Sequence, residues 1–128
     1  MALLLDTHAF LWWLAGEPKL SRRARAAIGD ADAEVFVSAA SAWEIATKYR
    51  LGKLPGAAII RSTIADAIAS QSFVALPITV VHAQRAGGLA GEHRDPFDRM
   101  LIAQAQSEDL ILISNEKLFD AFGVHRVW

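Results

Sequence analysis

Four acidic side chains and one amide occupy positions from which they could hold a metal ion together. Asp95 and Asp98, in DPFDRMLIAQA, would lie one turn apart on the same side of a helix. Asp6 ends the apolar run ALLL, Glu44 lies near the start of SAASAWEIATKYR, and Asn115 follows LILIS. Oxygen ligands without cysteine favour Mg²⁺ or Mn²⁺. Because such ions activate water and stabilise charge on a phosphodiester, the pattern favours phosphodiester hydrolysis.

The segment that begins at Asp95 also has a purely structural explanation. Asp95 before Pro96 is typical of a helix start, with Asp as the N-cap and Pro at the first helical position. Asp98 would then be the third helical residue, where a negative charge complements the helix dipole. The residues three, four and seven positions after it are apolar: Leu101, Ile102 and Ala105. This spacing directs Asp98 toward the core, where a carboxylate needs a partner.

Glu44 and Asp6 have structural alternatives of the same kind. Glu44 can complete a capping box with Ser41, or form an i, i+4 ion pair with Lys48. Asp6 can cap a helix that begins at Thr7. Like charges gathered at a poorly solvated sheet edge, however, repel one another unless a cation compensates them. Taken together, the acids therefore favour a metal site.

The elements that would position these side chains alternate between strand and helix. Apolar runs predict strands at 2–5, 35–37, 73–78, 110–113 and 124–127. Start and stop signals predict helices at 7–15, 21–29, 57–70, 79–86 and 95–107, another from Ser38 or Ser41 to 50, and a short turn or helix at 115–120. This alternation indicates an α/β fold with a mostly parallel sheet covered on both faces. In such sheets ligands bind beyond the carboxyl ends of the strands, where Asp6 and Asn115 stand.

The composition indicates a single compact domain, residues 1–128. The residues are 53% hydrophobic and 21% charged, which excludes a disordered chain. A net charge of −1 and an isoelectric point near 6.4 exclude the strongly basic surface of a non-specific nucleic-acid binder, so any such contact must be local. The absence of cysteine, and a start unlike a signal peptide or membrane span, favour a cytoplasmic protein.

Four segments occur in the order and spacing typical of PIN-domain proteins, and the chain most resembles the VapC-type toxins of bacterial toxin–antitoxin pairs. They are LLLDTHAFLWWL, SAASAWEIATK, HRDPFDRMLIAQA and LILISNEKLFDAFGVHRVW. The resemblance implies a three-layer αβα PIN-like domain and a metal-dependent endoribonuclease in which Asp6, Glu44 and Asp98 hold Mg²⁺ or Mn²⁺. It also implies that Asp95 is an additional acid of the site and that Thr7 supports it.

The same resemblance implies partners for the chain. They are an RNA substrate, a second copy in a homodimer, and a VapB-type antitoxin that lays a helix or an extended segment in a groove and blocks the site. Basic residues near the acids are candidates for positioning the RNA strand: Lys48, Arg94 and Arg99.

The acids have two rival interpretations. A haloacid-dehalogenase-like phosphatase also places an Asp after its first strand, but it needs a second Asp two residues later, where this chain has His8. The other is a PIN-fold protein that binds RNA or a protein without turnover. Asn115 favours it, because the family often has an acid there and an amide brings no charge, which would weaken a second metal site first. Asp95 or Glu116 could compensate.

Three tryptophans are candidates for the core or for a binding surface. Trp12 and Trp13 are adjacent, so a helix turns them to different faces and one of them can be exposed. Exposed aromatic rings can stack on bases or anchor protein interfaces. We expect at least one of this pair, and Trp43, to pack in the core.

Overall fold

A parallel sheet forms the centre of the protein. The computed structural model describes residues 1–60, 62–91 and 95–128. Within them the strands are β1 (Ala2–Leu5), β2 (Glu34–Ser38), β3 (Val74–Leu76), β4 (Ile111–Ile113) and β5 (Arg126–Val127). They lie in the order β3-β2-β1-β4-β5, and each neighbouring pair is parallel. The predicted α/β class is confirmed.

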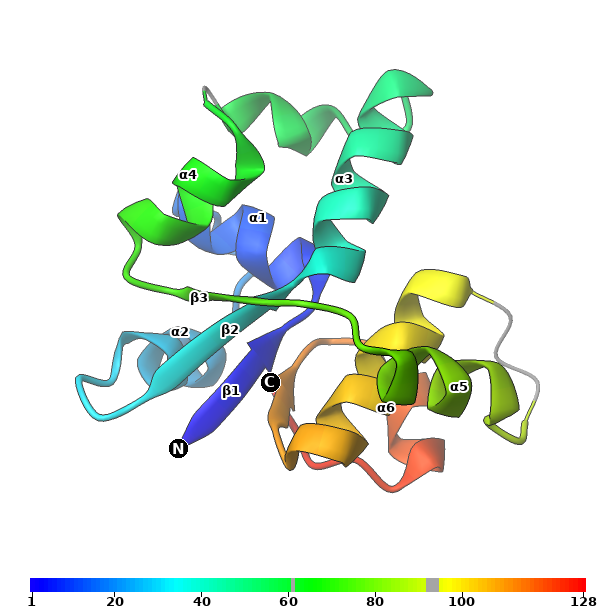
Figure 1. Cartoon of the computed structure of the whole chain (residues 1–128). Coiled ribbons are helices and arrows are strands. Elements are labelled where there is room, and N and C mark those ends of the chain that lie inside the picture. The colour runs from blue at the N-terminus through cyan, green and yellow to red at the C-terminus, as the bar shows by residue number, and fades with distance from the viewer. Residues whose placement is uncertain (61, 92–94) are drawn as a thin grey trace.

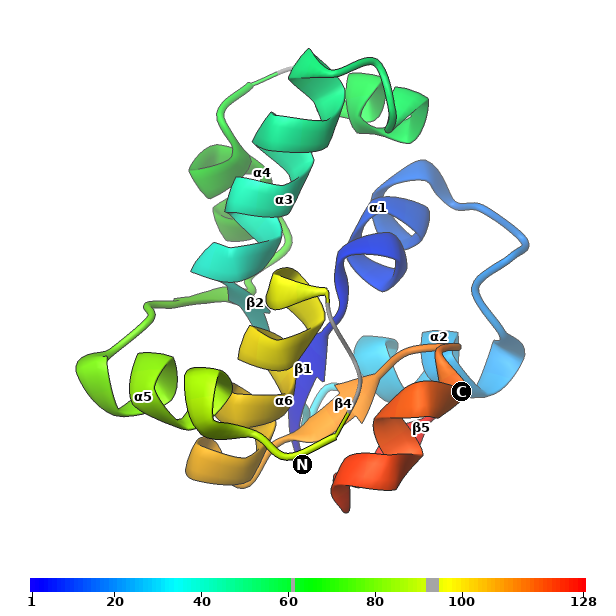
Figure 2. The same ribbon diagram turned by 90° about the vertical axis from the view of Figure 1, so that its right-hand side faces the viewer.

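Helices cover both faces of this sheet (Figures 1 and 2). The α-helices are α1 (Thr7–Ala15), α2 (Arg22–Gly29), α3 (Ala39–Arg50), α4 (Ile64–Ser70), α5 (Val80–Gly88) and α6 (Pro96–Glu108), and the 3₁₀ helices are η1 (Pro55–Ile59) and η2 (Lys117–Phe122). Figure 1 shows α5 and α6 on the opposite side of β1 from α1 and α2. In the described part of the chain, none of the helices is long and apolar enough to cross a membrane.

The side chains of β1 are buried on both faces, as the unbroken apolar run ALLL predicts. Leu3 and Leu5 belong to one core, which α1, α2 and α4 complete. Leu4 belongs to a second core, built with α6 and η2. Because side chains alternate along a strand, apolar residues at every position require cover on both faces. The predicted three-layer arrangement is therefore confirmed.

The helix predicted over 57–70 is divided in the structure. Ile60 follows η1 with an extended backbone, and α4 begins at Ile64. The hydroxyl oxygen of Thr63 accepts a hydrogen bond of 3.1 Å from the backbone N–H of Asp66. A threonine that caps a helix in this way has an extended backbone itself, so it interrupts a helix that would otherwise run through it.

Two strands are shorter than predicted by more than one residue. β3 ends at Leu76, and the next residue, Pro77, has no backbone N–H to donate to a neighbouring strand. β5 contains only Arg126 and Val127, because the chain first turns through Gly123 in a left-handed conformation.

Trp43 lies outside the core, so the prediction made for it is wrong. Its side chain is 61% exposed, and its ring packs edge-on against Phe97 with the centroids 4.8 Å apart. The buried face of α3 consists of Ala40, Ser41, Glu44 and Ile45. These positions follow helical spacing that turns residue 43 away from the sheet. Trp12 and Trp13 are both half-buried.

The strand order brings two strand ends together where folds of this class bind ligands. The chain passes from β1 to β2 and β3 in one direction and then returns past β1 to β4. The carboxyl ends of β1 and β4 therefore form the topological switch point of the sheet. Asp6 follows β1, and its backbone N–H donates to the carbonyl oxygen of Ile113 at the end of β4, at 3.1 Å.

Candidate active site

A cavity of about 360 Å³ opens at this edge of the sheet. It is lined by Asp6, Thr7, His8, Trp12, Glu44, Lys48, Asp95, Asp98, Asn115 and Glu116. These residues come from four parts of the chain: the start of α1, the middle of α3, the start of α6 and the turn after β4. The structure thus brings the four predicted acids and the predicted amide to one cavity.

Asp6 caps α1 and is buried beside other acids. Its Oδ1 atom accepts a hydrogen bond of 2.8 Å from the backbone N–H of Ala9, and the residue is only 8% exposed. Burial, together with the negative charges of Glu44 and Glu116, raises the pKa of Asp6 to about 6, although hydrogen bonds to Ser114 and Ala9 oppose the rise. The Asp6 carboxylate therefore lies where a positive charge would stabilise it.

Each carboxylate oxygen of the buried Glu44 has a partner. Ser38, rather than Ser41, caps α3, so Glu44 lies in the second turn and no capping box with Ser41 forms. Its Oε1 atom accepts a hydrogen bond from the Thr7 hydroxyl, and its Oε2 atom accepts one from the Lys48 ammonium group. The ion pair between Glu44 and Lys48 is thus present, and Thr7 holds the carboxylate from the other side.

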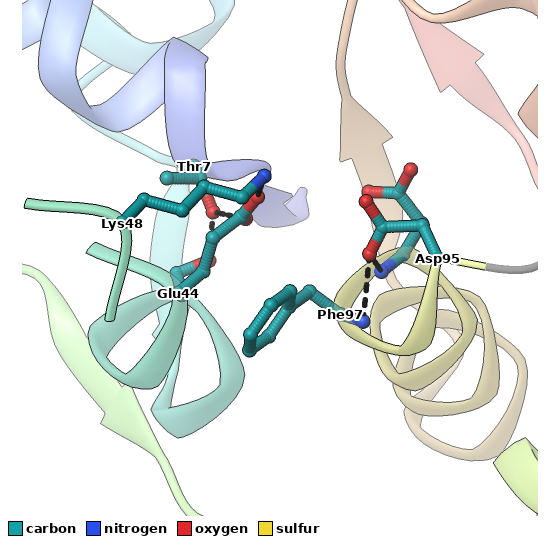
Figure 3. A network of polar contacts seen from close by, with 7 residues as sticks. Thr7, Glu44, Lys48, Asp95 and Phe97 are labelled. Carbon is teal, nitrogen blue, oxygen red and sulfur yellow. Dashed lines mark hydrogen bonds and ion pairs between the residues drawn. The ribbon is translucent and has the colours of Figure 1, made fainter. Parts of the chain in front are cut away.

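Asp95 faces Glu44 across the cavity, which Asp98 also lines. The Oδ1 atom of Asp95 accepts hydrogen bonds from the backbone N–H groups of Phe97 (2.9 Å) and Asp98 (3.2 Å), so Asp95 is the N-cap of α6, as predicted. Figure 3 shows Asp95 opposite Glu44 and Lys48, with the ring of Phe97 between the two sides. Asp98 is half-buried. The apolar residues predicted to lie behind it are buried: Leu101, Ile102 and Ala105.

The turn after β4 supplies an amide and a further carboxylate. Asn115 is exposed at the mouth of the cavity. The hydroxyl oxygen of Ser114 accepts a hydrogen bond from the backbone N–H of Glu116 at 2.9 Å, which fixes the turn. The Oε1 atom of Glu116 accepts one from the backbone N–H of Leu118 at 3.1 Å, so Glu116 caps η2 while it lines the cavity.

The three basic residues predicted to position RNA have different surroundings. Lys48 lines the cavity. The structure does not bring Arg99 there, because its guanidinium group donates to the backbone carbonyl oxygens of Ala86 (3.1 Å) and Leu89 (2.6 Å). Arg99 thereby ties α6 to the end of α5, whose last carbonyls attract a cation. Arg94 lies outside the described residues.

His8 and Trp12 also line the cavity. His8 was not predicted as a site residue, and Trp12 was predicted only as a candidate for the core or for a binding surface. Their rings lie 5.5 Å apart, and Trp12 also packs against Trp128 with the centroids 5.8 Å apart. Their spacing of four residues, beginning two residues after Asp6, was a sequence signal that both share the face of α1 next to the strand end.

The oxygen atoms that line the cavity are of the types that bind a hard divalent cation. They are carboxylate and amide oxygens, which are the ligands that Mg²⁺ and Mn²⁺ prefer in proteins. Among the described residues, no three Asp, Glu or His side chains are already close enough to hold one ion together.

Solved structures with the same fold include several toxin–antitoxin complexes. VapBC2 from Rickettsia felis, bound to a DNA fragment from its promoter, has a TM-score of 0.64 and 12% identity, covering 99% of this chain and 98% of that one. A toxin–antitoxin complex from Klebsiella pneumoniae has a TM-score of 0.66 and 20% identity, covering 98% and 96%. VapBC-1 from nontypeable Haemophilus influenzae has a TM-score of 0.63 and 15% identity, covering 99% and 97%.

At these identities the structural likeness establishes a shared fold. None of the curated proteins compared with the chain matches it significantly. The sequence itself matches the PIN domain family over residues 3–124, which includes every candidate residue described above. The chain therefore belongs to the PIN domain family.

Proposed function

We propose that the chain is a VapC-type toxin that hydrolyses RNA with Mg²⁺ or Mn²⁺. One observation carries the proposal: carboxylates from four separate parts of the chain line one cavity at the switch point of the sheet. Membership of the PIN domain family, whose members are generally nucleases, supports the same conclusion. So does the buried Asp6, because burial among like charges leaves its carboxylate in need of a cation.

The side chains have separable roles in this proposal. A bound divalent ion would supply an activated water and charge stabilisation at the scissile phosphate. Asp6, Glu44 and Asp98 would hold the ion, and Asp95 and Asn115 would add oxygen ligands at its rim. Thr7 orients Glu44 through its hydroxyl group. Lys48 lines the same cavity, where its ammonium group would help to position the RNA strand.

The proposal predicts metal-dependent cleavage. The purified protein should cut a mixed RNA pool in Mg²⁺ or Mn²⁺ and leave it intact in EDTA. A Glu44→Gln preparation controls for a contaminating nuclease, and Asp32→Asn, in the exposed turn before β2, is the matched acid-to-amide control away from the cavity. Cleavage that persists in EDTA, or that Glu44→Gln leaves unchanged, would contradict the proposal.

A second candidate function is RNA or protein binding without turnover. Asn115 favours it, because it brings no charge to a position where the family often has an acid. If the protein binds Mn²⁺ but cuts no RNA, an Asn115→Asp variant distinguishes a nuclease that Asn115 has inactivated from a protein that only binds. Cleavage restored by that substitution would assign the loss to Asn115, whereas continued inactivity would favour a binding protein.

We also propose that the chain acts in the cytoplasm, forms a homodimer and pairs with a VapB-type antitoxin. Exposed apolar side chains support a protein partner: Val80 and Val81, at the start of α5, are 84% and 64% exposed. Nearby, Trp43, Ile78 and Phe97 line an apolar cavity of about 200 Å³. Burying such surface stabilises association. Light scattering should give twice the chain mass of 13.9 kDa, and a single chain mass would contradict the homodimer.

A further inference from the structure

Lys48 pairs with Glu44 on one side of the cavity, opposite Asp95. Its Nζ atom donates to Oε2 of Glu44 and lies 5.8 Å from the centroid of the Phe97 ring. Burial lowers the pKa of Lys48, but its hydrogen bond to Glu44 and the charges of Glu44, Asp95 and Asp98 outweigh this effect and raise it. The ammonium group is therefore within electrostatic reach of both sides, and it is charged at neutral pH.

We propose that Lys48 is the internal cation of the metal-free site, and that a divalent ion binds by displacing its ammonium group from Glu44. The inference rests on the proposed metal-dependent function and concerns what must happen before that function begins. In this proposal Lys48 neutralises Glu44 until the metal binds, which an ordinary ion pair on a helix surface would not do.

The two oxygens of Glu44 give the physical reason for an exchange. One oxygen accepts from Thr7 and the other from Lys48, so both already have a hydrogen-bond donor. A divalent ion on Oε2 would lie close to the Lys48 ammonium group, and two cations at that distance repel strongly where water is scarce. Thr7 is neutral and can keep its hydrogen bond. Lys48 is therefore the group that must move.

Lys48 is able to move, whereas Glu44 is held in place. The side chain of Lys48 is 31% exposed and has a flexible stem, so it can withdraw toward solvent. Glu44 is buried and anchored by Thr7. An exposed i, i+4 pair stabilises a protein only slightly. Here the acidic partner is buried among other acids, so the lysine compensates a charge that would otherwise be unpaired.

Metal affinity tests the exchange directly. Lys48→Met removes the charge but keeps an apolar stem of similar length. Lys53→Met is the matched control, since Lys53 is exposed just after α3 and does not line the cavity. Calorimetric titration with Mn²⁺ should give a dissociation constant about three- to tenfold lower for Lys48→Met than for the parent, and no comparable change for Lys53→Met.

Thermal unfolding gives a second readout that does not depend on RNA cleavage. Saturating Mn²⁺ should raise the melting temperature of Lys48→Met above its value in EDTA by more than it raises that of the parent, because only the parent gives up an ion pair on binding. If the parent binds Mn²⁺ and Lys48→Met binds it equally or more weakly, the exchange is refuted while the metal-dependent function stands. If neither protein binds Mn²⁺, both proposals fail.

Discussion

An Asp98→Asn protein is expected to cleave RNA at least about a thousandfold more slowly than the parent, whereas Asp95→Asn should cost less than about tenfold. A lost metal ligand removes several kcal/mol of transition-state stabilisation, and about 4 kcal/mol corresponds to a thousandfold in rate. Asn at position 95 keeps the cap of α6, because its amide oxygen can still accept from the backbone N–H groups that Asp95 serves. The two acids of the DPFD segment would then have different roles.

Cleavage rates under single-turnover conditions in Mg²⁺ and Mn²⁺ provide the comparison. Asp95→Ala is the informative companion, because it removes the cap and should lower the free energy of unfolding by about 1 kcal/mol. A similar thousandfold loss in Asp95→Asn would make Asp95 an essential ligand rather than a cap with a supporting role. Activity retained in Asp98→Asn would remove Asp98 from the metal site.

The sequence predicted the parts of the fold that depend on local rules. Apolar residues at every position of β1 required two covered faces, and Leu3 and Leu4 belong to different cores. Asp before Pro predicted the start of α6, where Asp95 caps the helix. The rule for parallel sheets then predicted that acids after strand ends would meet. For these reasons the four acids and the amide of the cavity could be named from the sequence, whereas His8 was not.

The remaining features depend on packing between distant segments. Arg99 is basic and near the acids in sequence, yet the free carbonyls of Ala86 and Leu89 bind its guanidinium group. The sequence around Arg99 does not show whether its side chain binds these carbonyls or RNA. Trp43 was expected in the core because large aromatic residues usually are, but the phase of the helix relative to the sheet turns it outward. Helical phase was readable from the sequence only once the buried face of α3 was known.

The separation between the two sides of the cavity could not be predicted either. Sequence rules bring Glu44 and Asp98 to the same edge, but the distance between their carboxylates depends on side-chain conformations and on Lys48. The i, i+4 pair of Glu44 and Lys48 was one of two alternatives for that helix, and the structure contains it inside the cavity. Glu44 is therefore both a member of an ion pair and a candidate metal ligand, so its structural and functional interpretations are compatible.

Asp6→Asn is expected to stabilise the metal-free protein while it destroys the proposed metal site. Burial raises the pKa of Asp6 from its ordinary value of 3.8 to about 6, so folding disfavours the charged form. The folded parent therefore loses stability as the pH rises from about 4 through about 6. Asn can cap α1 without carrying that charge. In EDTA at pH 8 the variant should gain about 1–2 kcal/mol, or roughly 4–8 °C in melting temperature.

The dependence of this stability gain on pH and on metal shows whether it comes from removing the Asp6 charge or from a general effect of the substitution. At pH 4.5 the Asp6 carboxyl is largely protonated in the folded parent, so most of the advantage of the variant should be lost. In saturating Mn²⁺ at pH 8 the order should reverse, because the parent gains binding free energy that the variant cannot. A gain that is independent of pH would place the effect outside the Asp6 charge. A gain that persists in Mn²⁺ would mean that Asp6 does not bind the metal, and the buried carboxylate would then need another explanation.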